Sequence, residues 1–192
     1  MDDAADKEIV FTADRAVWRR WLSEHFETSD EVWLAFPTKE SGEESILYND
    51  AVEEALCFGW IDSISLRLDS KYLLKRFTPR RKNSPYSRPN IERLIWLDSQ
   101  GMIHPKVMPG VIGLITEEYE FPEDIIDRIR DDSEAWENYQ SFPEPYKRIR
   151  IAYIDAARKR PEEFEKRLES FLSKTRQNKM VGGFGGVEKY YQ

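Results

Sequence analysis

The stretch ALCFGWIDS, Ala55–Ser63, decides the predicted fold, because a helical pattern gives way there to a strand pattern. Asp50, with Glu53 three residues later, resembles a capping box and predicts the start of a helix. Gly59 is the expected end of this helix. From there to Leu68, apolar and polar residues alternate, which is typical of a half-buried strand.

Two further strands and one further helix complete the expected N-terminal part. After a turn at Asp69 and Ser70, the segment Lys71–Thr78 returns as a strand, so a hairpin forms whose leucine-rich side faces the helices and whose other side carries Arg or Lys. The segment EVWLAFP, 31–37, predicts a buried strand, and Thr12 caps a helix through Phe26.

These elements predict an α+β fold, with a small antiparallel sheet and packed helices followed by a helical C-terminal part. We expect residues 1–103 to form the α+β domain, which carries the FGWID and FTPRR motifs, and residues 104–119 to be a linker. Proline residues and caps predict four helices within a helical subdomain at 120–178. The Gly-rich tail, 179–192, is expected to be flexible, or ordered only against a partner.

Composition indicates a globular protein that stays in the cytoplasm. Hydrophobic residues make up 40% of the 192 residues and aromatic residues 13%, which is too aromatic for a disordered chain. The acidic N-terminus does not resemble a secretory signal, and no apolar run approaches the roughly 18 residues of a membrane span. The single cysteine, Cys57, excludes an internal disulfide. We expect Cys57 to be a small buried hydrophobe, because a nucleophile near a helix C-terminus lacks a favourable dipole.

Positive charge is concentrated in one part of an acidic chain. The formal net charge is −7, yet the stretch from Arg67 to Arg93 holds nine basic and two acidic residues. Such a stretch concentrates anions, while the acidic remainder repels polyanions. We therefore expect a small anionic ligand and do not expect nucleic acid as a partner. The alternative is a solvated basic loop that pairs with the acidic remainder.

The candidate ligand site combines the basic loop with the FGWID corner. Arginine side chains bind phosphate or carboxylate through two parallel hydrogen bonds, hydroxyl groups add donors, and the start of a helix at Asn90 adds a positive dipole end. Asp62 could belong to this site, or it could have an equally plausible structural role in which it orients Arg76 or Arg80. The candidate ligand-binding residues are Trp60, Asp62, Arg76, Thr78, Arg80, Arg81, Ser84, Tyr86, Ser87 and Asn90.

The chemistry at this site stays open between three functions. The first is a binding protein for a small anion, and the second is an enzyme acting on a phosphorylated or carboxylated metabolite with Asp62 as its acid or base. The third is a protein or nucleic-acid interaction module in which Tyr86 stacks on a base. His25 and His104 lack neighbours at metal-ligand spacing, and neither a P-loop nor GxGxxG is present, so no metal and no cofactor are expected. The oligomeric state is left open.

The order of these motifs resembles the bacteriocin-protection or YdeI/OmpD-associated family. The resemblance rests on the run from Tyr48 to Asp62, the RFTPRR stretch, Trp18 to Leu22 and the C-terminal helical segments. Two departures from the family pattern are Tyr86 in place of a tryptophan and Arg160-Pro161-Glu162 in place of Glu-Thr-Arg. The resemblance implies a bacterial cytoplasmic protein linked to stress and bacteriocin protection, with an α+β front and a helical back, and it implies no settled chemistry.

Overall fold

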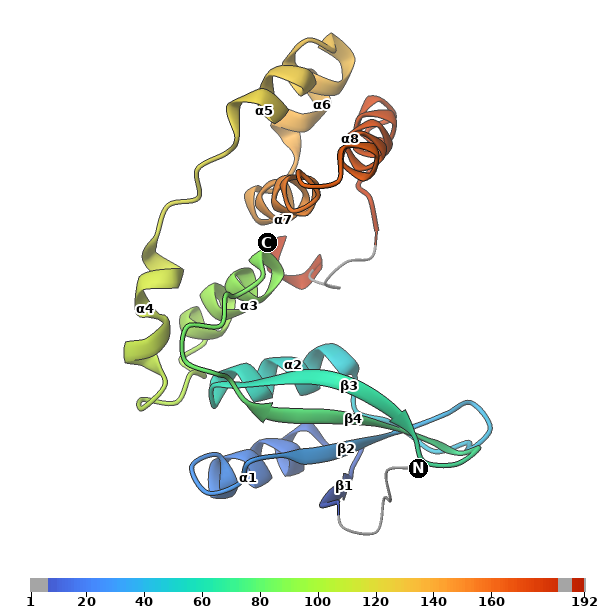
Figure 1. The fold of residues 1–192 in the computed structure, drawn as a ribbon, viewed down its shortest axis with the longest axis vertical. Coiled ribbons are helices and arrows are strands. Elements are labelled where there is room, and N and C mark those ends of the chain that lie inside the picture. The colour runs from blue at the N-terminus through green and yellow to red at the C-terminus, as the bar shows by residue number, and fades with distance from the viewer. Residues whose placement is uncertain (1–6, 183–187, 192) are drawn as a thin grey trace. The chain divides into compact units, whose positions relative to one another are not determined.

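The computed structural model describes residues 7–182 and 188–191, which form two compact units. One unit contains the chain up to Pro85 together with Leu97–Ile112, and the other contains Tyr86–Trp96 together with the residues from Gly113 onward. Sheet and helices in the first unit and helices in the second confirm the expected α+β class (Figure 1).

The first unit is built on a four-stranded sheet of order β1-β2-β4-β3. Its strands are β1 (Ile9–Phe11), β2 (Val32–Pro37), β3 (Trp60–Arg67) and β4 (Tyr72–Pro79). The β2–β4 and β3–β4 pairs are antiparallel, as expected, but β1 pairs with β2 in parallel. The sheet is therefore mixed, because a helix, α1 (Arg15–His25), connects the neighbouring strands β1 and β2 and brings the chain back in the same direction.

The predicted helix-to-strand change is confirmed at Gly59. Helix α2 (Tyr48–Cys57) ends just before this glycine, whose φ of +72° lies in the left-handed region that favours glycine. The start of α2 differs from the prediction, because Leu47 is the N-cap and Asp50 lies inside the first turn. The hairpin turn follows the predicted chemistry, since Asp69 Oδ1 accepts hydrogen bonds from the amides of Lys71 and Tyr72 at 2.7 and 2.9 Å.

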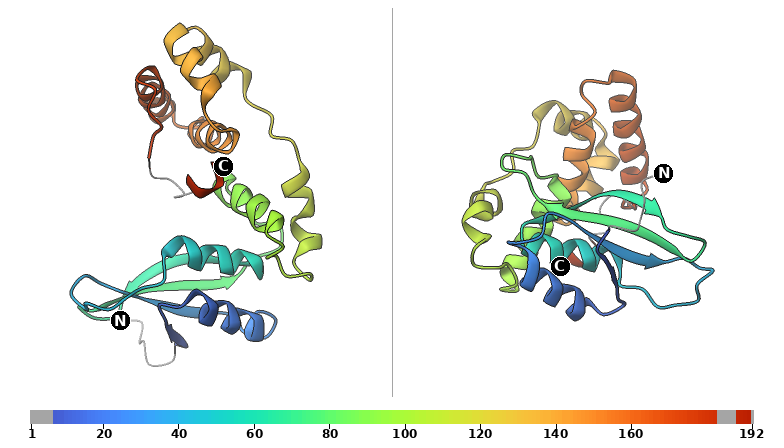
Figure 2. Two further views of the ribbon diagram at one scale, coloured as in Figure 1. Left: turned by 180° about the vertical axis from the view of Figure 1, so that it is seen from behind. Right: turned by 60° about the horizontal axis from the view of Figure 1, so that its bottom comes forward.

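Helices α1 and α2 cover the same face of the sheet (Figure 2). On that face, Phe77 of β4 contacts Trp18 of α1, with ring centroids 5.2 Å apart. Lys75 has the same orientation, and its Nζ lies 5.5 Å from the centre of the Tyr48 ring of α2. The basic side chain of Lys75 therefore faces a helix, contrary to the prediction.

The leucine-rich side of the hairpin lies on the opposite face. Leu74 is paired with Ala35 and with Leu66, so these side chains share a face. Together with Trp33 they form a small cluster in which Leu74 is fully buried. The prediction that the leucines face the helices is wrong, because the bulky Trp33 supplies a second apolar layer on this side.

A buried carboxylate joins the two helices. Glu54 of α2 is only 1% exposed, and it accepts hydrogen bonds from Arg15 Nε at 2.5 Å and from Arg19 Nη1 at 2.6 Å. Arg19 also donates to the carbonyl oxygen of Met102 at 2.8 Å. Because a buried carboxylate is costly unless it is paired, the two arginines compensate the charge of Glu54 and link α1 to α2.

Cys57 is buried one turn after Glu54. Burial of the thiol, with the nearby Glu54 carboxylate as a second cause, raises the pKa of Cys57 to about 12. Such a thiol stays protonated at neutral pH and does not act as a nucleophile. This environment agrees with the interpretation of Cys57 as a buried hydrophobe.

The second unit contains the four helices that the sequence predicts. They are α5 (Glu123–Arg130), α6 (Ser133–Ser141), α7 (Glu144–Asp155) and α8 (Pro161–Arg176). Their core gathers apolar residues from all four helices, including the fully buried Ile125 and Tyr146. Helices α3 (Arg88–Ser99) and α4 (Met108–Thr116) each contribute residues to both units, and α4 lies within the segment expected to be a linker. Within the described part of the chain, no helix has both the length and the apolarity that crossing a bilayer requires.

Part of the C-terminal tail is ordered against the second unit. The amide of Val181 donates to Tyr146 Oη at 2.8 Å. The segment 183–187 lies outside the described residues, so the predicted flexibility is not tested there. The chain then forms a short 3-10 helix, η2 (Glu188–Tyr191), in which Tyr190 packs against Trp96 and Ile149. Tyr190 is only 5% exposed, so packing against this unit orders the chain end.

A second buried carboxylate joins α3 to α7. Glu92 is 2% exposed, and both of its oxygens accept hydrogen bonds from Arg148 at 2.7 Å. Arg88 donates to the same carboxylate at 2.7 Å from one turn away. This bidentate geometry is the strong form of an arginine–carboxylate pair, and it raises the pKa of Arg148.

Replacing the first buried carboxylate should destabilise the N-terminal unit. We expect Glu54→Gln to lower the free energy of unfolding by about 2 kcal/mol, because it removes charge-assisted hydrogen bonds to Arg15 and Arg19. Urea denaturation at neutral pH measures the effect. Glu24→Gln, which changes an exposed glutamate of α1, is the matched control, and equal unfolding midpoints for the two variants would contradict the role given to Glu54.

The buried thiol should resist labelling in the folded protein. A pKa raised from 9 to about 12 lowers the thiolate fraction near pH 8 by roughly 1,000-fold. We expect a maleimide or disulfide reagent to label native Cys57 at least about 100-fold more slowly than the urea-unfolded chain. Cys57→Ala provides the blank, and fast labelling of the native protein would show that the thiol is accessible and reactive.

Candidate functional site

The ten residues predicted as a ligand site divide between the two units. Trp60, Asp62, Arg76, Thr78, Arg80, Arg81 and Ser84 lie in the first unit, and Tyr86, Ser87 and Asn90 lie in the second. The structure therefore does not bring all ten together within one compact unit.

Asp62 is bound by groups other than the predicted arginines. Its Oδ2 accepts a hydrogen bond from Tyr48 Oη at 2.7 Å and lies 3.3 Å from Lys75 Nζ. Arg76 instead binds Glu31, with Arg76 Nε donating at 2.7 Å. Burial alone would raise the pKa of Glu31, but hydrogen bonds from Trp33 and Arg76 outweigh it and lower that pKa. These contacts favour the scaffold interpretation of Asp62.

Trp60 also serves the scaffold. It is 1% exposed, its Nε1 donates to the carbonyl oxygen of Phe26 at 3.2 Å, and its ring packs edge-on against Trp21. A ligand cannot reach this ring without opening the core. Thr78 lies beside it on β4, opposite Ile61.

The basic loop is braced by one of its own arginines. Arg80 Nη2 donates to the carbonyl oxygens of Pro85 at 2.9 Å and of Ser84 at 3.3 Å. Its backbone amide donates to the carbonyl oxygen of Gly59 at 2.9 Å. Arg81 and Ser84 are exposed. Arg80 thus closes the loop on itself, and Arg81 faces the solvent.

Of the three residues in the second unit, Ser87 and Asn90 make hydrogen bonds at the start of α3. The amide of Asn90 donates to the carbonyl oxygen of Ser87 at 2.9 Å, and Asn90 Oδ1 accepts from Arg93 at 2.9 Å. Tyr86 borders a hollow whose other residues include Glu117, Glu118 and Glu120. This acidic lining does not suit an anion.

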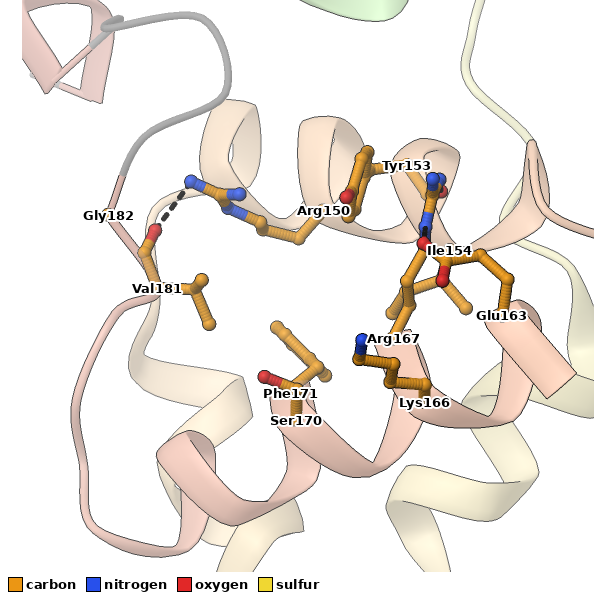
Figure 3. Close-up of a pocket in the computed structure, with 10 residues that line it drawn as sticks. All are labelled: Arg150, Tyr153, Ile154, Glu163, Lys166, Arg167, Ser170, Phe171, Val181 and Gly182. Atoms are coloured by element: carbon orange, nitrogen blue, oxygen red, sulfur yellow. Dashed lines mark hydrogen bonds and ion pairs between the residues drawn. The ribbon is translucent and has the colours of Figure 1, made fainter.

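A different cavity has the properties expected of an anion site. It lies between α7 and α8 in the second unit, with a volume of about 370 Å³, and the segment Val181–Gly182 borders its end (Figure 3). Helix α7 contributes Arg150, Tyr153 and Ile154, and helix α8 contributes Glu163, Lys166, Arg167, Ser170 and Phe171. On both helices these residues follow the spacing of three and four that places side chains on one face.

Two of the three cations in this cavity have structural partners. Arg167 Nε donates to Glu163 Oε1 at 2.8 Å, and Arg167 Nη1 donates to the carbonyl oxygen of Tyr153 at 2.7 Å. The guanidinium carbon lies 3.8 Å from the centre of the Tyr153 ring, so the two groups stack. The hydrogen bond from Arg167 lowers the pKa of Glu163. Arg150, which is 4% exposed, donates to the carbonyl oxygen of Val181.

Lys166 is the cation that remains available. Figure 3 shows its side chain extending from α8 toward the space bordered by Phe171 and Val181. Among residues 7–182 and 188–191, its ammonium forms no hydrogen bond and no ion pair. The exposed Ser170 follows it by one helical turn on the same face. Lys166 and Ser170 therefore present donors to the cavity.

Sequence reasoning missed this cavity, although a signal was present. Arg150 and Tyr153 are three residues apart on one predicted helix, and Glu163, Lys166, Arg167 and Ser170 recur at three- and four-residue spacing on the next. Each stripe alone resembles the solvated face of a helix. Only the pairing of α7 with α8 brings the two stripes together.

Metal chemistry has no support from the residues that the structure describes. In those ranges, no group of three or more histidine, cysteine, aspartate or glutamate side chains could hold a metal ion. Direct binding through lysine and hydroxyl donors is the chemistry that the cavity between α7 and α8 offers.

Two family models match separate parts of the chain. Residues 10–109 match a domain of unknown function (DUF8412), and residues 118–178 match the family described as Bacteriocin-protection, YdeI or OmpD-Associated. The FGWID and FTPRR motifs lie in the first match, and the helices that border the cavity lie in the second. Neither the curated proteins nor the solved structures gave a match. Because the first match covers more than half of the 192 residues, the chain belongs to the DUF8412 family, and its residues 118–178 form a bacteriocin-protection, YdeI or OmpD-associated segment.

Proposed function

We propose that this chain is a bacteriocin-protection-type protein that binds a small anionic ligand in the cavity between α7 and α8. The observation that carries the proposal is the position of Lys166. Its ammonium extends into a cavity of about 370 Å³ and has no carboxylate within ion-pair distance among the described residues. A volume of this size lies within the usual range for small-molecule sites, roughly 300–1,000 Å³.

The charges around the cavity favour an anion. Three cations, Arg150, Lys166 and Arg167, border it together with a single carboxylate, Glu163. Glu163 is paired with Arg167 and Arg150 donates to the carbonyl oxygen of Val181, so Lys166 is the cation that we expect to bind the ligand. A concave site with low-dielectric walls strengthens this attraction, and a charge-assisted hydrogen bond from Lys166 would be stronger than one between neutral groups.

The partners of two of the three arginines in the sequence-predicted site favour the same location. Arg76 and Arg80 bind protein groups of the first unit, whereas Lys166 binds none of the described residues. Apart from Val181 and Gly182, the residues that border the cavity lie within the segment that matches the bacteriocin-protection family. The proposed ligand site therefore moves from the basic loop to α7 and α8.

Removing the lysine charge should abolish most of the binding. Wild-type protein would be titrated calorimetrically with phosphate, acetate, benzoate, glucose 6-phosphate and AMP at constant ionic strength. We expect at least one of these anions to bind, and Lys166→Gln to weaken its affinity by about 10- to 100-fold, because a hydrogen bond to a charged group contributes about 1.5–3 kcal/mol.

Two further variants control this experiment. Lys174→Gln changes another exposed lysine of α8 that does not border the cavity, so it should leave the affinity unchanged. Arg80→Ala/Arg81→Ala tests the basic loop in the same way. If the double variant loses binding while Lys166→Gln keeps it, the ligand binds at the loop and the proposal for α7 and α8 is wrong.

A further inference from the structure

The cavity between α7 and α8 also indicates which anions it accepts. On the basis of the proposed function, we infer that its ligand is a small amphipathic anion, with one carboxylate or phosphate group bound at Lys166 and Ser170 and an apolar body on the floor of the cavity. The cavity has a single available cation, and an inorganic anion bound to that cation would neither fill the cavity nor contact its apolar side chains.

The volume exceeds what an inorganic anion fills. A cavity of about 370 Å³ lies within the range of sites that hold whole small molecules, roughly 300–1,000 Å³. A carboxylate or phosphate group has only a few heavy atoms, so it would leave most of this space to water. A ligand with a body of several carbon atoms fills the cavity better.

The floor of the cavity is apolar. Ile154 and Phe171 border it but belong to the core of the second unit and are only 1% and 2% exposed, so the half-buried Val181 presents more apolar surface than they do. Val181 packs against the same core and borders the cavity at its other end. Its amide and carbonyl are held by Tyr146 and Arg150, which fixes the position of its side chain. Water against such a surface is readily displaced by a ligand's hydrocarbon.

The polar groups lie at one side of this floor. Lys166 and Ser170 follow each other by one turn on the exposed face of α8, whereas the donors of Arg167 are bound to Glu163 and to the backbone of Tyr153. One ammonium and one hydroxyl group match one anionic head group. Because these donors lie apart from the apolar side chains, the cavity matches a ligand that has an anionic head group and an apolar body.

A homologous series of ligands tests this inference. Calorimetric titration would compare acetate, butyrate, hexanoate and phenylacetate, with methyl, butyl and phenyl phosphate as a second series that distinguishes the two head groups. A fully buried methylene group is expected to tighten binding up to about fourfold. We expect the dissociation constant to fall by about two- to fourfold per carbon until the floor is covered.

Two variants separate the contributions of head and body. Lys166→Gln should weaken every member of the series by a similar factor and leave the dependence on chain length unchanged. Val181→Thr keeps the shape of the side chain but adds a hydroxyl group, so it should flatten that dependence. Val17→Thr, at an exposed valine of α1, is the matched control, and circular dichroism would verify that each variant is folded.

The outcomes distinguish this inference from the function on which it rests. If acetate and hexanoate bind equally well and both depend on Lys166, the cavity is an anion site without an apolar preference, and only the inference fails. If no member binds, both fail. If chain length matters but neither Val181→Thr nor Lys166→Gln changes binding, the ligands bind elsewhere, and the inference is again overturned.

Discussion

A carboxylate that is taken out of water must be neutralised, and both compact units contain a carboxylate that is buried and bound by arginines. In the first unit Glu54 is bound by two arginines of α1, and in the second Glu92 is bound by Arg88 and Arg148. Each set ties two helices together with charge-assisted hydrogen bonds. Because breaking a buried pair leaves a charge without compensation, these contacts restrict which helices can pack together.

The same requirement gives several basic residues of the sequence partners within the protein. Arg76 binds Glu31, Arg80 binds the carbonyls of its own loop, and Arg88 binds the buried Glu92. An arginine written in a sequence looks the same whether it serves an internal carboxylate or an external anion. The difference is decided by partners that lie far away along the chain, such as Glu31 for Arg76, 45 residues apart.

Local signals predicted the elements well, and long-range pairing decided the rest. The change from helix to strand at Gly59, the turn at Asp69 and the proline-led helices of the second unit depend on chemistry within a few residues. The three-residue strand β1 gives too short a pattern to be recognised, and its pairing with β2 made the sheet mixed. Likewise, the orientation of Leu74 depended on the distant Trp33 and not on its neighbours.

The surroundings of Lys166 likewise depend on a contact between two helices that the sequence of α8 alone does not reveal. Lys166 is an ordinary solvated lysine as long as α8 is considered alone. Once Arg167 is bonded to the backbone of Tyr153 and stacked on its ring, α8 is fixed against α7 and Lys166 is directed into the space between them. Glu163 could have neutralised Lys166, but it binds Arg167 instead. The ion pair of Arg167 with Glu163 lies within α8, whereas the hydrogen bond and the stacking of Arg167 with Tyr153 join α8 to α7. Lys166 is left without an ion pair among the described residues, and the proposed anion site rests on this arrangement.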